Sequence, residues 1–180
     1  MINEIQIEEI KINDEKIKID YHYFTDSYYK LEIQQESDGW KINMILKKLN
    51  QKVEKKSKSI LFQNYVENPK VFRCQFQKQT VAHLQIGYDS WNNRVRIWDI
   101  NIDERFRRIG IGSKMIDFIK EYALNIKARA IVLETQTCNV PAINFYLKHG
   151  FELIGFDSIH YTNQDIQKKE VRIELGLIVC

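Results

Sequence analysis

The sequence predicts an α/β (α+β) fold in which a mixed, mostly antiparallel central sheet is flanked by helices. Three observations support this prediction. Residues 70–103 contain three strand-like runs separated by polar turns. An amphipathic helix pattern follows at 113–124, and 130–136 starts with the unbroken apolar run typical of a central strand covered on both sides. With 180 residues and 44% hydrophobic content, we expect a single domain spanning residues 1–180.

The first sixty residues are the least readable part of the chain. Residues 5–20 alternate apolar and charged side chains, which permits strand or edge structure. Residues 41–56 fit a helix whose apolar stripe is most simply core: Ile42, Ile45, Leu46 and Leu49. Core packing under a loop and ligand stacking both explain the aromatic side chains here, and core packing is favoured. These aromatic residues are Tyr23, Phe24, Tyr28, Tyr29 and Trp40.

The middle of the chain predicts an antiparallel meander over 70–77, 80–88 and 94–103, with a turn at 89–93. In the helix that follows, one set of side chains is predicted to face inward: Met115, Ile116, Ile119 and Ala123. The charged set on the other face is Lys114, Asp117, Lys120 and Glu121. Two closing strands, about 151–161 and 170–179, complete the predicted sheet.

The turn between the third strand and this helix reads Arg-Arg-Ile-Gly-Ile-Gly over 107–112. A glycine-permissive turn at a helix N-terminus lets backbone N–H groups point at an anion, and arginines neutralise what docks. We therefore expect a phosphate or pyrophosphate ligand. The dinucleotide pattern needs a third glycine where this chain has Met115, and the Walker Gly-Lys-Ser/Thr sequence is absent.

A second block follows about 25 residues later, with Leu-Glu-Thr-Gln at 133–136 and a short helix pattern after it. Asn139 is a good N-cap, Pro141 is tolerated in a first turn, and Gly150 is a C-terminal stop. The helix is therefore about ten residues long. Its positions 139, 143 and 146 are spaced to share one stripe, so the Asn139 amide and the Tyr146 phenol are predicted to face the same groove.

Together, the Arg-x-x-Gly-x-Gly loop and the second block resemble the GNAT superfamily of N-acetyltransferases over about residues 80–175, with 1–60 on the acceptor side. Trp-Asn-Asn-Arg at 91–94 and Phe-Asp at 156–157 look like its streptothricin acetyltransferase branch. The chain departs from that branch at Trp98, where members carry Glu, and at 173–176, where they carry an aromatic cluster. The resemblance implies that the strands ending at Asp103 and Gln136 are parallel neighbours that splay apart.

The resemblance also implies acetyl-CoA as acetyl donor, with direct transfer to an amine and no covalent enzyme intermediate. Backbone groups of residues 100–102 would bind the pantetheine arm, and a backbone N–H there would stabilise the oxyanion, an effect worth about 3 kcal/mol per donor in other enzymes. The cofactor-binding residues implied are Ile100, Asn101, Ile102, Arg107, Arg108, Ile109, Gly110, Ile111, Gly112, Ser113, Asn139 and Tyr146.

Two proton transfers need side chains. Tyr146 matches the family motif and is our candidate for the general acid, because a phenol pKa of about 10 keeps it protonated at neutral pH. Asp99 and Glu134 are both candidates for the base, since carboxylates amid apolar neighbours accept protons more readily. Each could equally be a structural partner of Arg94, Arg96 or Lys148, and a water-mediated base is a further alternative. Strand alternation puts Trp98 and Asp99 on opposite faces unless a bulge intervenes, and Trp98 is a candidate wall of the acceptor pocket.

The predicted acceptor is a small-molecule amine such as a streptothricin-like or aminoglycoside-like antibiotic or a polyamine. Acidic side chains at Asp26, Glu32, Glu36 and Asp38 suit a polycation, although solvated loop charge explains them equally well. One alternative is a protein or peptide N-acetyltransferase with an open groove. Another is a non-catalytic acetyl-CoA-binding module.

Composition excludes other classes. A net charge of +3 from 27 basic and 24 acidic residues argues against nucleic acid as a main partner. No apolar run reaches the roughly 20 residues of a membrane span, and residues 1–4 lack signal-peptide character, so we expect a cytoplasmic protein. Cys74, Cys138 and Cys180 suit reduced thiols rather than disulfides or a metal site, and no metal is expected. The apolar end at 175–179 could pair across a homodimer or simply close the sheet.

Overall fold

The computed structural model describes residues 5–11 and 17–179, and the chain divides into two compact units. The first unit contains Met1–Tyr21, Ser57–Leu133 and Gly176–Cys180. The second contains His22–Lys56 and Glu134–Leu175.

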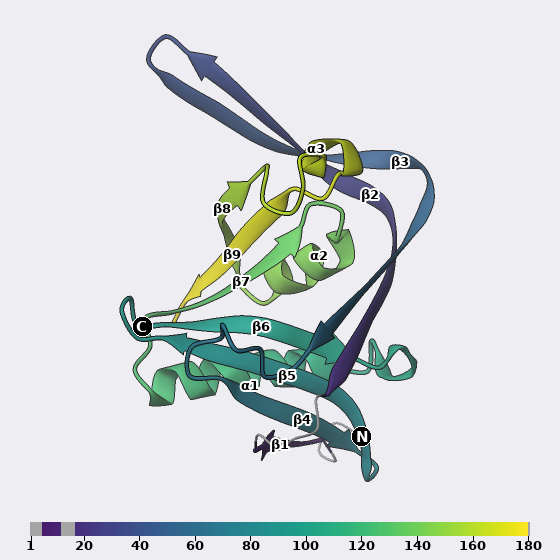
Figure 1. Ribbon diagram of the computed structural model, residues 1–180, viewed down its shortest axis with the longest axis vertical. Helices are drawn as coiled ribbons and strands as arrows, with labels where there is room; N and C mark the ends of the chain where they lie inside the picture. The colour runs from purple at the N-terminus through teal and green to yellow at the C-terminus, as the bar shows by residue number, and fades with distance from the viewer. Residues whose placement is uncertain (1–4, 12–16, 180) are drawn as a thin grey trace. The chain divides into compact units, whose positions relative to one another are not determined.

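The first unit is built on an antiparallel meander with one parallel addition (Figure 1). Its hydrogen-bonded order is β1-β4-β5-β6-β7, with only the β6–β7 pair parallel among them. The predicted mostly antiparallel, mixed sheet is therefore confirmed. The strands are β1 (Gln6–Ile10), β4 (Lys70–Phe76), β5 (Gln79–Asp89), β6 (Arg94–Ile102) and β7 (Ala130–Gln136).

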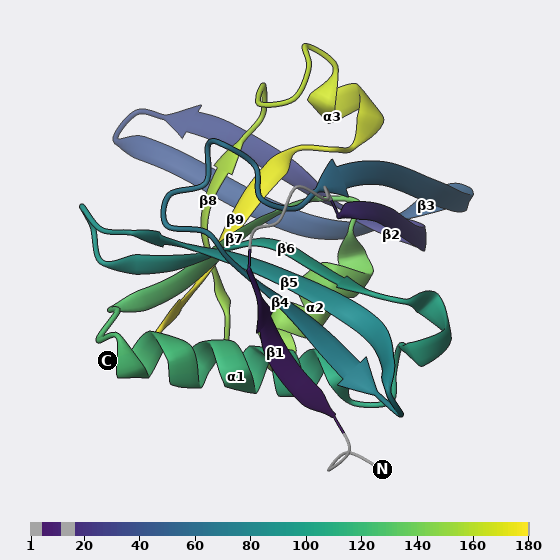
Figure 2. The same ribbon diagram turned by 60° about the horizontal axis from the view of Figure 1, so that its bottom comes forward.

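Helix α1 (Ile111–Asn125) runs across one face of this sheet, as Figure 2 shows. The inward set predicted from its periodicity is buried, since Met115, Ile116, Ile119 and Ala123 are at most 1% exposed. Phe118 adds an edge-to-face contact with Phe72 of β4, with ring centroids 4.8 Å apart. A short 3-10 turn, η2 (Glu104–Phe106), connects β6 to the loop before α1.

Strand β6 contains a bulge at Trp98. Asp99 pairs with Gln85 and Ile97 pairs with Ile86, so Trp98 is one residue extra on β6. On the neighbouring strand, a Cβ at Gly87 would lie 2.8 Å from both the Trp98 Nε1 and the Glu67 carbonyl oxygen, so a side chain does not fit there. Simple alternation, which puts Trp98 and Asp99 on opposite faces, therefore fails at this point of the strand.

In the second unit, β2 (Lys18–Glu36) and β3 (Gly39–Ile60) form a long two-stranded hairpin whose ends continue into the first unit. The predicted helix over 41–56 is wrong. Its stripe is not core either, because Ile42 is 49% and Leu46 50% exposed. Pairing with β2 satisfies the backbone groups along one edge of this segment, and a strand places the same apolar residues differently from a helix.

The rest of the second unit follows the prediction closely. Its order is β7-β9-β8, with β8 at Glu152–Asp157 and β9 at Arg172–Ile178. Helix α2 (Val140–Lys148) is capped by Asn139, whose side chain accepts a hydrogen bond from the Ala142 N–H at 3.4 Å. Gly150 adopts φ 89° beyond its C-terminus, as the stop signal predicts. A one-turn helix, α3 (Asp165–Lys168), was not predicted.

Three smaller predictions can be compared with the structure. β9 lies between β7 and β8, so closing the sheet, rather than pairing across a dimer, accounts for the apolar end of the chain. Cys74 and Cys138 are free and buried. Cys180 and the first four residues, on which the signal-peptide prediction rests, lie outside the described residues. Among the helices that the structure describes, none is long and apolar enough to cross a membrane.

Candidate functional site

The loop before α1 has the backbone of an anion-binding turn. Gly110 is the N-cap residue and adopts φ 95°, ψ −5°, the left-handed region that favours glycine. Lys114 donates the first hydrogen bond of the helix, to the Gly110 carbonyl at 3.1 Å. The N–H groups of Ile111 and Gly112 precede that bond, at the positive end of the helix dipole. These donors fit a pyrophosphate.

The arginines in and near the α1 loop differ in their burial and in their partners. Arg107 is half-buried and its Nε donates to the Ile102 carbonyl at 3.0 Å, which ties the loop to the end of β6. Arg108 and Ile109 are exposed, and Ser113 is half-buried in the first turn of α1. Arg105 is held by Asp103 through a 2.6 Å contact, which lowers the pKa of that carboxyl to about 2. Arg108 is therefore an exposed cation within the turn itself.

The predicted pantetheine segment, residues 100–102, is the last part of β6. The ladder with β7 joins Arg94–Ile97 to Ala130–Leu133. Beyond it, residues 100–102 are paired with β5 on the other edge of β6. Asn101 also donates from its side chain to the Asp20 carbonyl at 3.2 Å. The backbone groups of Ile100, Asn101 and Ile102 on the edge of β6 away from β5 are those that the resemblance assigns to pantetheine.

Asp99 is buried in a network of neutral groups within the first unit. It is 5% exposed and accepts hydrogen bonds from the Tyr21 hydroxyl at 2.8 Å and the Gln63 amide at 3.2 Å. Gln63 in turn accepts from the side chain of Gln85, which is fully buried and accepts from the Phe62 backbone N–H. Sequence reasoning missed Tyr21 and Gln63, because no local pattern connects them to Asp99.

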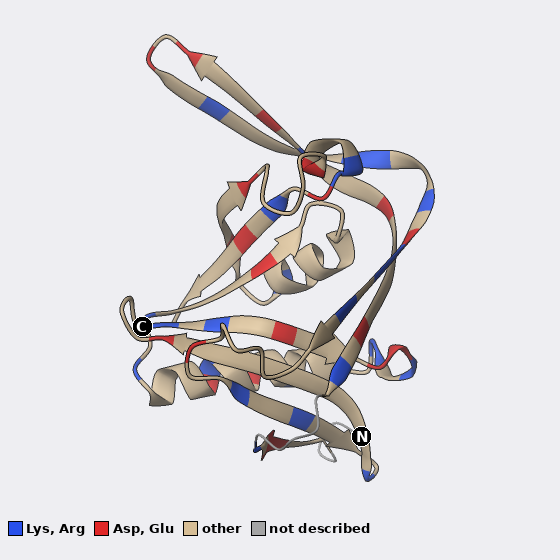
Figure 3. Ribbon diagram, viewed as in Figure 1, with Lys and Arg blue, Asp and Glu red and all other residues tan. Residues whose placement is uncertain are grey.

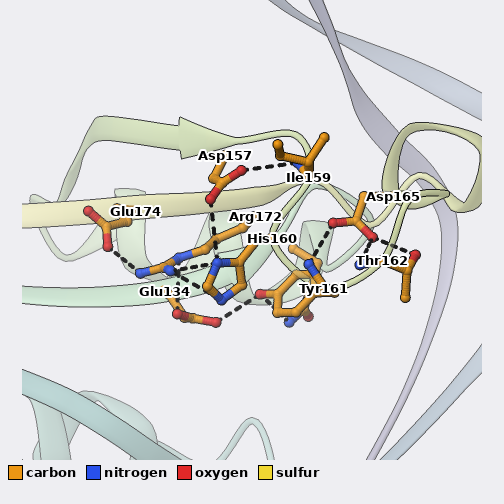
Figure 4. A network of polar contacts seen from close by, with 10 residues as sticks. Glu134, Asp157, Ile159, His160, Tyr161, Thr162, Asp165, Arg172 and Glu174 are labelled. Atoms are coloured by element: carbon orange, nitrogen blue, oxygen red, sulfur yellow. Dashed lines mark hydrogen bonds and ion pairs between the residues drawn. The ribbon is translucent and has the colours of Figure 1, made fainter.

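Glu134 lies in the second unit in a charged network (Figure 4). Its carboxylate accepts from the Tyr161 hydroxyl at 2.8 Å and lies 3.0 Å from the Arg172 Nε. Arg172 also pairs with Glu174 at 2.5 Å and contacts the His160 ring at 3.0 Å. Glu134 is thus paired with Arg172, and not with Arg94, Arg96 or Lys148, the partners that the sequence suggested. In the first unit, Arg94 and Arg96 lie 3.9 and 3.8 Å from Asp89.

Tyr146 is buried in an aromatic setting on α2. It is 6% exposed, and its ring lies 5.3 Å from that of Phe145 and 5.5 Å from that of Phe151, centroid to centroid. Burial raises the pKa of Tyr146 above its usual value, so the phenol stays protonated at neutral pH. Ile143 is also buried and Asn139 is half-buried, which agrees with one shared stripe on the helix.

Comparison with known families identifies the chain. The sequence pattern of the Acetyltransferase (GNAT) family matches residues 27–151. The chain belongs to the GNAT family. The residues matched include the α1 loop, Asp99, Glu134 and Tyr146, so the predicted site lies within the matched part of the chain.

Curated relatives of this GNAT chain include streptothricin acetyltransferases. It is 42% identical to that of Escherichia coli over 95 residues, which cover 53% of this chain and 54% of the relative. It is 34% identical to that of Streptomyces lavendulae over 76 residues, 42% of this chain and 40% of the relative. The chain thus spans about half the length of the curated relatives it matches, or less.

Solved structures match over nearly the whole chain. One, assigned as a streptothricin acetyltransferase of Bacillus anthracis str. Ames and complexed with acetyl coenzyme A, has a TM-score of 0.76 and 26% identity and covers 97% of both chains. Nourseothricin acetyltransferase has a TM-score of 0.74 over 98% of this chain and 99% of its own, with 19% identity, which shows the shared fold.

The aromatic residues near the start of this GNAT chain lie on strands rather than under a loop. Tyr23 on β2 is half-buried, and its hydroxyl lies 3.4 Å from the Cys138 thiol. Phe24 is 43% and Trp40 65% exposed, so neither is core. The acidic residues of this region include Asp26, which pairs with Lys48 at 2.8 Å in solvent. This agrees with solvated charge for that residue.

Trp98, the candidate wall of an acceptor pocket, lies in the first unit. Its ring is 5.4 Å from that of Tyr65, and the Arg96 guanidinium is 5.6 Å from its centre. Its indole N–H is buried and has no hydrogen-bond partner among the residues that the structure describes. The bulge on β6 thus carries both an aromatic surface and, one residue on, the buried Asp99.

Proposed function

We propose that this chain transfers an acetyl group from acetyl-CoA directly to an amine of a small-molecule antibiotic of the streptothricin class. The observation that carries the proposal is the left-handed turn at Gly110, with Ile111 and Gly112 N–H groups at the start of α1. This geometry suits the pyrophosphate of acetyl-CoA. The acceptor class is supported by the streptothricin acetyltransferases among the relatives of the chain.

The chain's own groups would hold the acetyl donor in three ways. The Ile111 and Gly112 N–H groups would donate to the pyrophosphate, and Arg107 and Arg108 would neutralise its charge. Backbone groups of β6 at residues 100–102, on the edge away from β5, would bind the pantetheine arm. Of these, the Ile102 carbonyl already accepts from Arg107, so we assign pantetheine binding to the remaining groups.

Proton transfer would use two side chains. We assign Tyr146 the role of general acid toward the departing thiolate, because burial keeps its phenol protonated. We assign Asp99 the role of base toward the attacking ammonium, because its partners Tyr21 and Gln63 are neutral and leave its charge uncompensated. Glu134 is less suited, because Arg172 already neutralises it.

A peptide N-acetyltransferase is the second candidate. The chain is 36% identical over 86 residues to N-alpha-acetyltransferase 30 of Dictyostelium discoideum. The antibiotic class is favoured because the structural likeness to the streptothricin acetyltransferase of B. anthracis covers 97% of this chain, hairpin included. The likeness to Ard1 of Thermoplasma volcanium, with a TM-score of 0.54, covers 61%.

The first experiment is a thiol-release assay with acetyl-CoA and a panel of streptothricin, aminoglycosides, polyamines and short peptides. We expect coenzyme A release with streptothricin, and a mono-acetylated product by mass spectrometry. Release with peptides alone would favour the second candidate. Binding of acetyl-CoA without turnover on any amine would favour the non-catalytic module.

Replacing Tyr146 tests the acid. We expect Tyr146→Phe to lower kcat by about 100-fold, the low end for general acid–base catalysis, while calorimetry shows acetyl-CoA affinity unchanged. Tyr28→Phe is the matched control, because Tyr28 is a half-buried tyrosine of the same unit whose ring, rather than its hydroxyl, contacts Lys169. We expect the control to keep wild-type kcat. An unchanged kcat in Tyr146→Phe would remove Tyr146 from the proton transfer.

A further inference from the structure

Gln85 is a buried glutamine that the proposed chemistry does not yet use. It lies on β5, paired with Asp99 of β6 in the sheet, and its side chain is fully buried. Its amide oxygen accepts a hydrogen bond from the Phe62 backbone N–H, and its amide nitrogen donates to the side-chain oxygen of Gln63. A buried amide is costly unless its donors and acceptors are paired. Here the pairing leads through Gln63 to Asp99.

A backbone group fixes the direction of this chain of hydrogen bonds. The Phe62 N–H can only donate, so the oxygen of the Gln85 amide faces it and the nitrogen faces Gln63. The Gln63 amide must then turn its oxygen to Gln85 and its nitrogen to Asp99, to which it donates at 3.2 Å. Turning either amide over would bring two donors or two acceptors together. The network therefore presents a donor to Asp99.

The loop that carries Gln63 is held in place by further contacts. The Gln63 amide nitrogen also donates to the Ser59 hydroxyl at 3.0 Å. The Gln63 backbone carbonyl accepts from the N–H of the buried Val66 at 3.1 Å. Phe62 adopts φ 62°, a conformation that bulky L-residues rarely take and that persists only where the surroundings hold it. This conformation belongs to the residue whose N–H sets the direction of the network.

Asp99 receives donors at both of its oxygens. The Tyr21 hydroxyl donates to Oδ1 at 2.8 Å, and the Gln63 amide donates to Oδ2 at 3.2 Å. Hydrogen bonds donated to a carboxylate favour its charged form over its protonated form. The two donors therefore stabilise the state of Asp99 that can accept a proton.

The charged and titratable side chains of the neighbouring strands have other partners or lie farther along the sheet. Asp99 is the one acidic residue of β6, and the cations of that strand, Arg94 and Arg96, lie 3.9 and 3.8 Å from Asp89 of β5 (Figure 3). His83 of β5 is paired with Asn101, two positions beyond Asp99 on β6. The donors named above are thus the hydrogen-bond partners of Asp99 among the residues that the structure describes.

We propose that Gln85 is a positioning residue for acetyl transfer, which acts through Gln63 to hold a donor on Asp99 and so keeps this carboxyl ionised. The inference rests on the proposed function, in which Asp99 takes the proton of the attacking amine. Without Gln85, the Gln63 amide is free to turn its oxygen toward the carboxylate. That arrangement favours the protonated form of Asp99, which cannot accept a proton.

The test is the pH profile of kcat/KM for the amine, measured by thiol release with Gln85→Met. Methionine is similar in length and lacks the amide. A carboxylate that has lost a donor binds its proton at a higher pH, so the acid limb of the profile should move to higher pH. We expect kcat/KM to fall about tenfold on the acid limb and to recover toward wild type at high pH. The titration of the amine itself is common to all variants.

Two comparisons separate positioning from a loss of structure. Gln75→Met is the matched control, the same substitution at a half-buried glutamine of β4 in the same unit, and should keep the wild-type profile. In a Gln63→Met background the relay is already cut, so adding Gln85→Met should move the acid limb no further. A residue that only stabilises the fold would lower activity at every pH, and its effect would add to that of Gln63→Met.

A second readout does not need turnover. The side-chain amide signals of Gln63 in NMR spectra are assigned by their absence in Gln63→Met. As the pH falls, we expect them to shift in wild type, to shift at a higher pH in Gln85→Met, and not to shift in Asp99→Asn.

Three outcomes overturn the proposal. One is a wild-type acid limb in Gln85→Met in a protein that Asp99→Asn inactivates, which leaves acetyl transfer and its base in place. Another is an additive loss at every pH in the double variant. The third is a Gln63 signal that does not follow pH, or that follows it alike in wild type and Gln85→Met. This last result decides the inference even if wild-type protein releases no coenzyme A, which would be the failure of the proposed function itself.

Discussion

The end of β6 and the end of β7 each carry a candidate base, but the two carboxylates have different surroundings. Asp99 is 5% exposed, and its hydrogen bonds come from the neutral Tyr21 and Gln63. Glu134 has a side chain 35% exposed and an ion pair with Arg172. Glu134 therefore has a cationic partner, whereas Asp99 has none among the residues that the structure describes. The two carboxylates thus differ in their partners rather than in their position on a strand, and this difference is why we propose Asp99 rather than Glu134 as the base.

The largest expected effect is on Asp99. We predict that Asp99→Asn lowers kcat by at least about 100-fold, because general-base catalysis contributes about 10² to 10⁴ in rate. The KM for acetyl-CoA should change less than kcat, because the substitution alters the Asp99 side chain, whereas the groups that we assign to acetyl-CoA on this strand belong to the backbone of residues 100–102. Steady-state kinetics with saturating amine measure both constants.

Tyr21→Phe sharpens this prediction. It removes the 2.8 Å hydrogen bond to Asp99 while the carboxylate and its Gln63 contact remain. If Asp99 is the base and Tyr21 positions it, kcat should fall less than in Asp99→Asn and KM for the amine should rise. If Asp99→Asn leaves kcat near wild type, a water-mediated base is the better account.

The next effect concerns the α1 loop. Gly110→Ala forces a Cβ into a backbone at φ 95°, which costs about 1–2 kcal/mol for an L-residue. We predict a rise of about tenfold in the KM for acetyl-CoA with a small change in kcat, measured by thiol release. Gly39→Ala is the matched control, because a Cβ there meets no atom within 4 Å. Equal effects of the two substitutions would contradict an anion-binding role for the turn.

The α1 region was predictable because its signals are local. The helix stripe, the glycine turn and the Asn139 cap each occupy a few consecutive residues, and α1, β7 and α2 begin and end within two residues of expectation. The motif that pointed to Tyr146 as a candidate acid is also local, because it lies within the short helix pattern that follows Asn139. The order β7-β9-β8, by contrast, depends on which strands pair, and a single stretch of sequence does not carry that information.

The hairpin and the surroundings of Asp99 were not predictable, for related physical reasons. Ile42, Ile45, Leu46 and Leu49 fit a helix as well as Trp40, Ile42, Met44 and Leu46 fit a strand. Pairing with β2 decides between them, and it is a tertiary contact. Tyr21 and Gln63 lie 78 and 36 positions from Asp99 in the chain, so only the fold brings them to the carboxylate.

A smaller effect is expected at Glu134. Glu134→Gln retains an acceptor for the Tyr161 hydroxyl and removes the charge opposite Arg172, which still has Glu174 at 2.5 Å. Because the pair is partly exposed, we predict a loss of at most about 1 kcal/mol in the free energy of unfolding, measured by urea denaturation, and a kcat close to wild type. A fall in kcat as large as that of Asp99→Asn would reverse the comparison and make Glu134 the base.

The smallest expected effect is the pH dependence of stability due to His83, which lies on β5 opposite Asn101 of β6. Burial, with a smaller contribution from the Arg73 charge, lowers the pKa of His83 in the folded protein. Above the unfolded pKa of about 6.5 the ring is neutral in both states. As the pH falls below that value, the unfolded chain binds a proton first, so stability is lost down to the lower folded pKa.

We predict that His83→Asn loses less thermal stability than wild type between pH 7.5 and pH 5.5, measured by calorimetry. A wild-type protein that gains stability relative to the variant over this interval would show that the folded state favours the protonated ring, contrary to its burial.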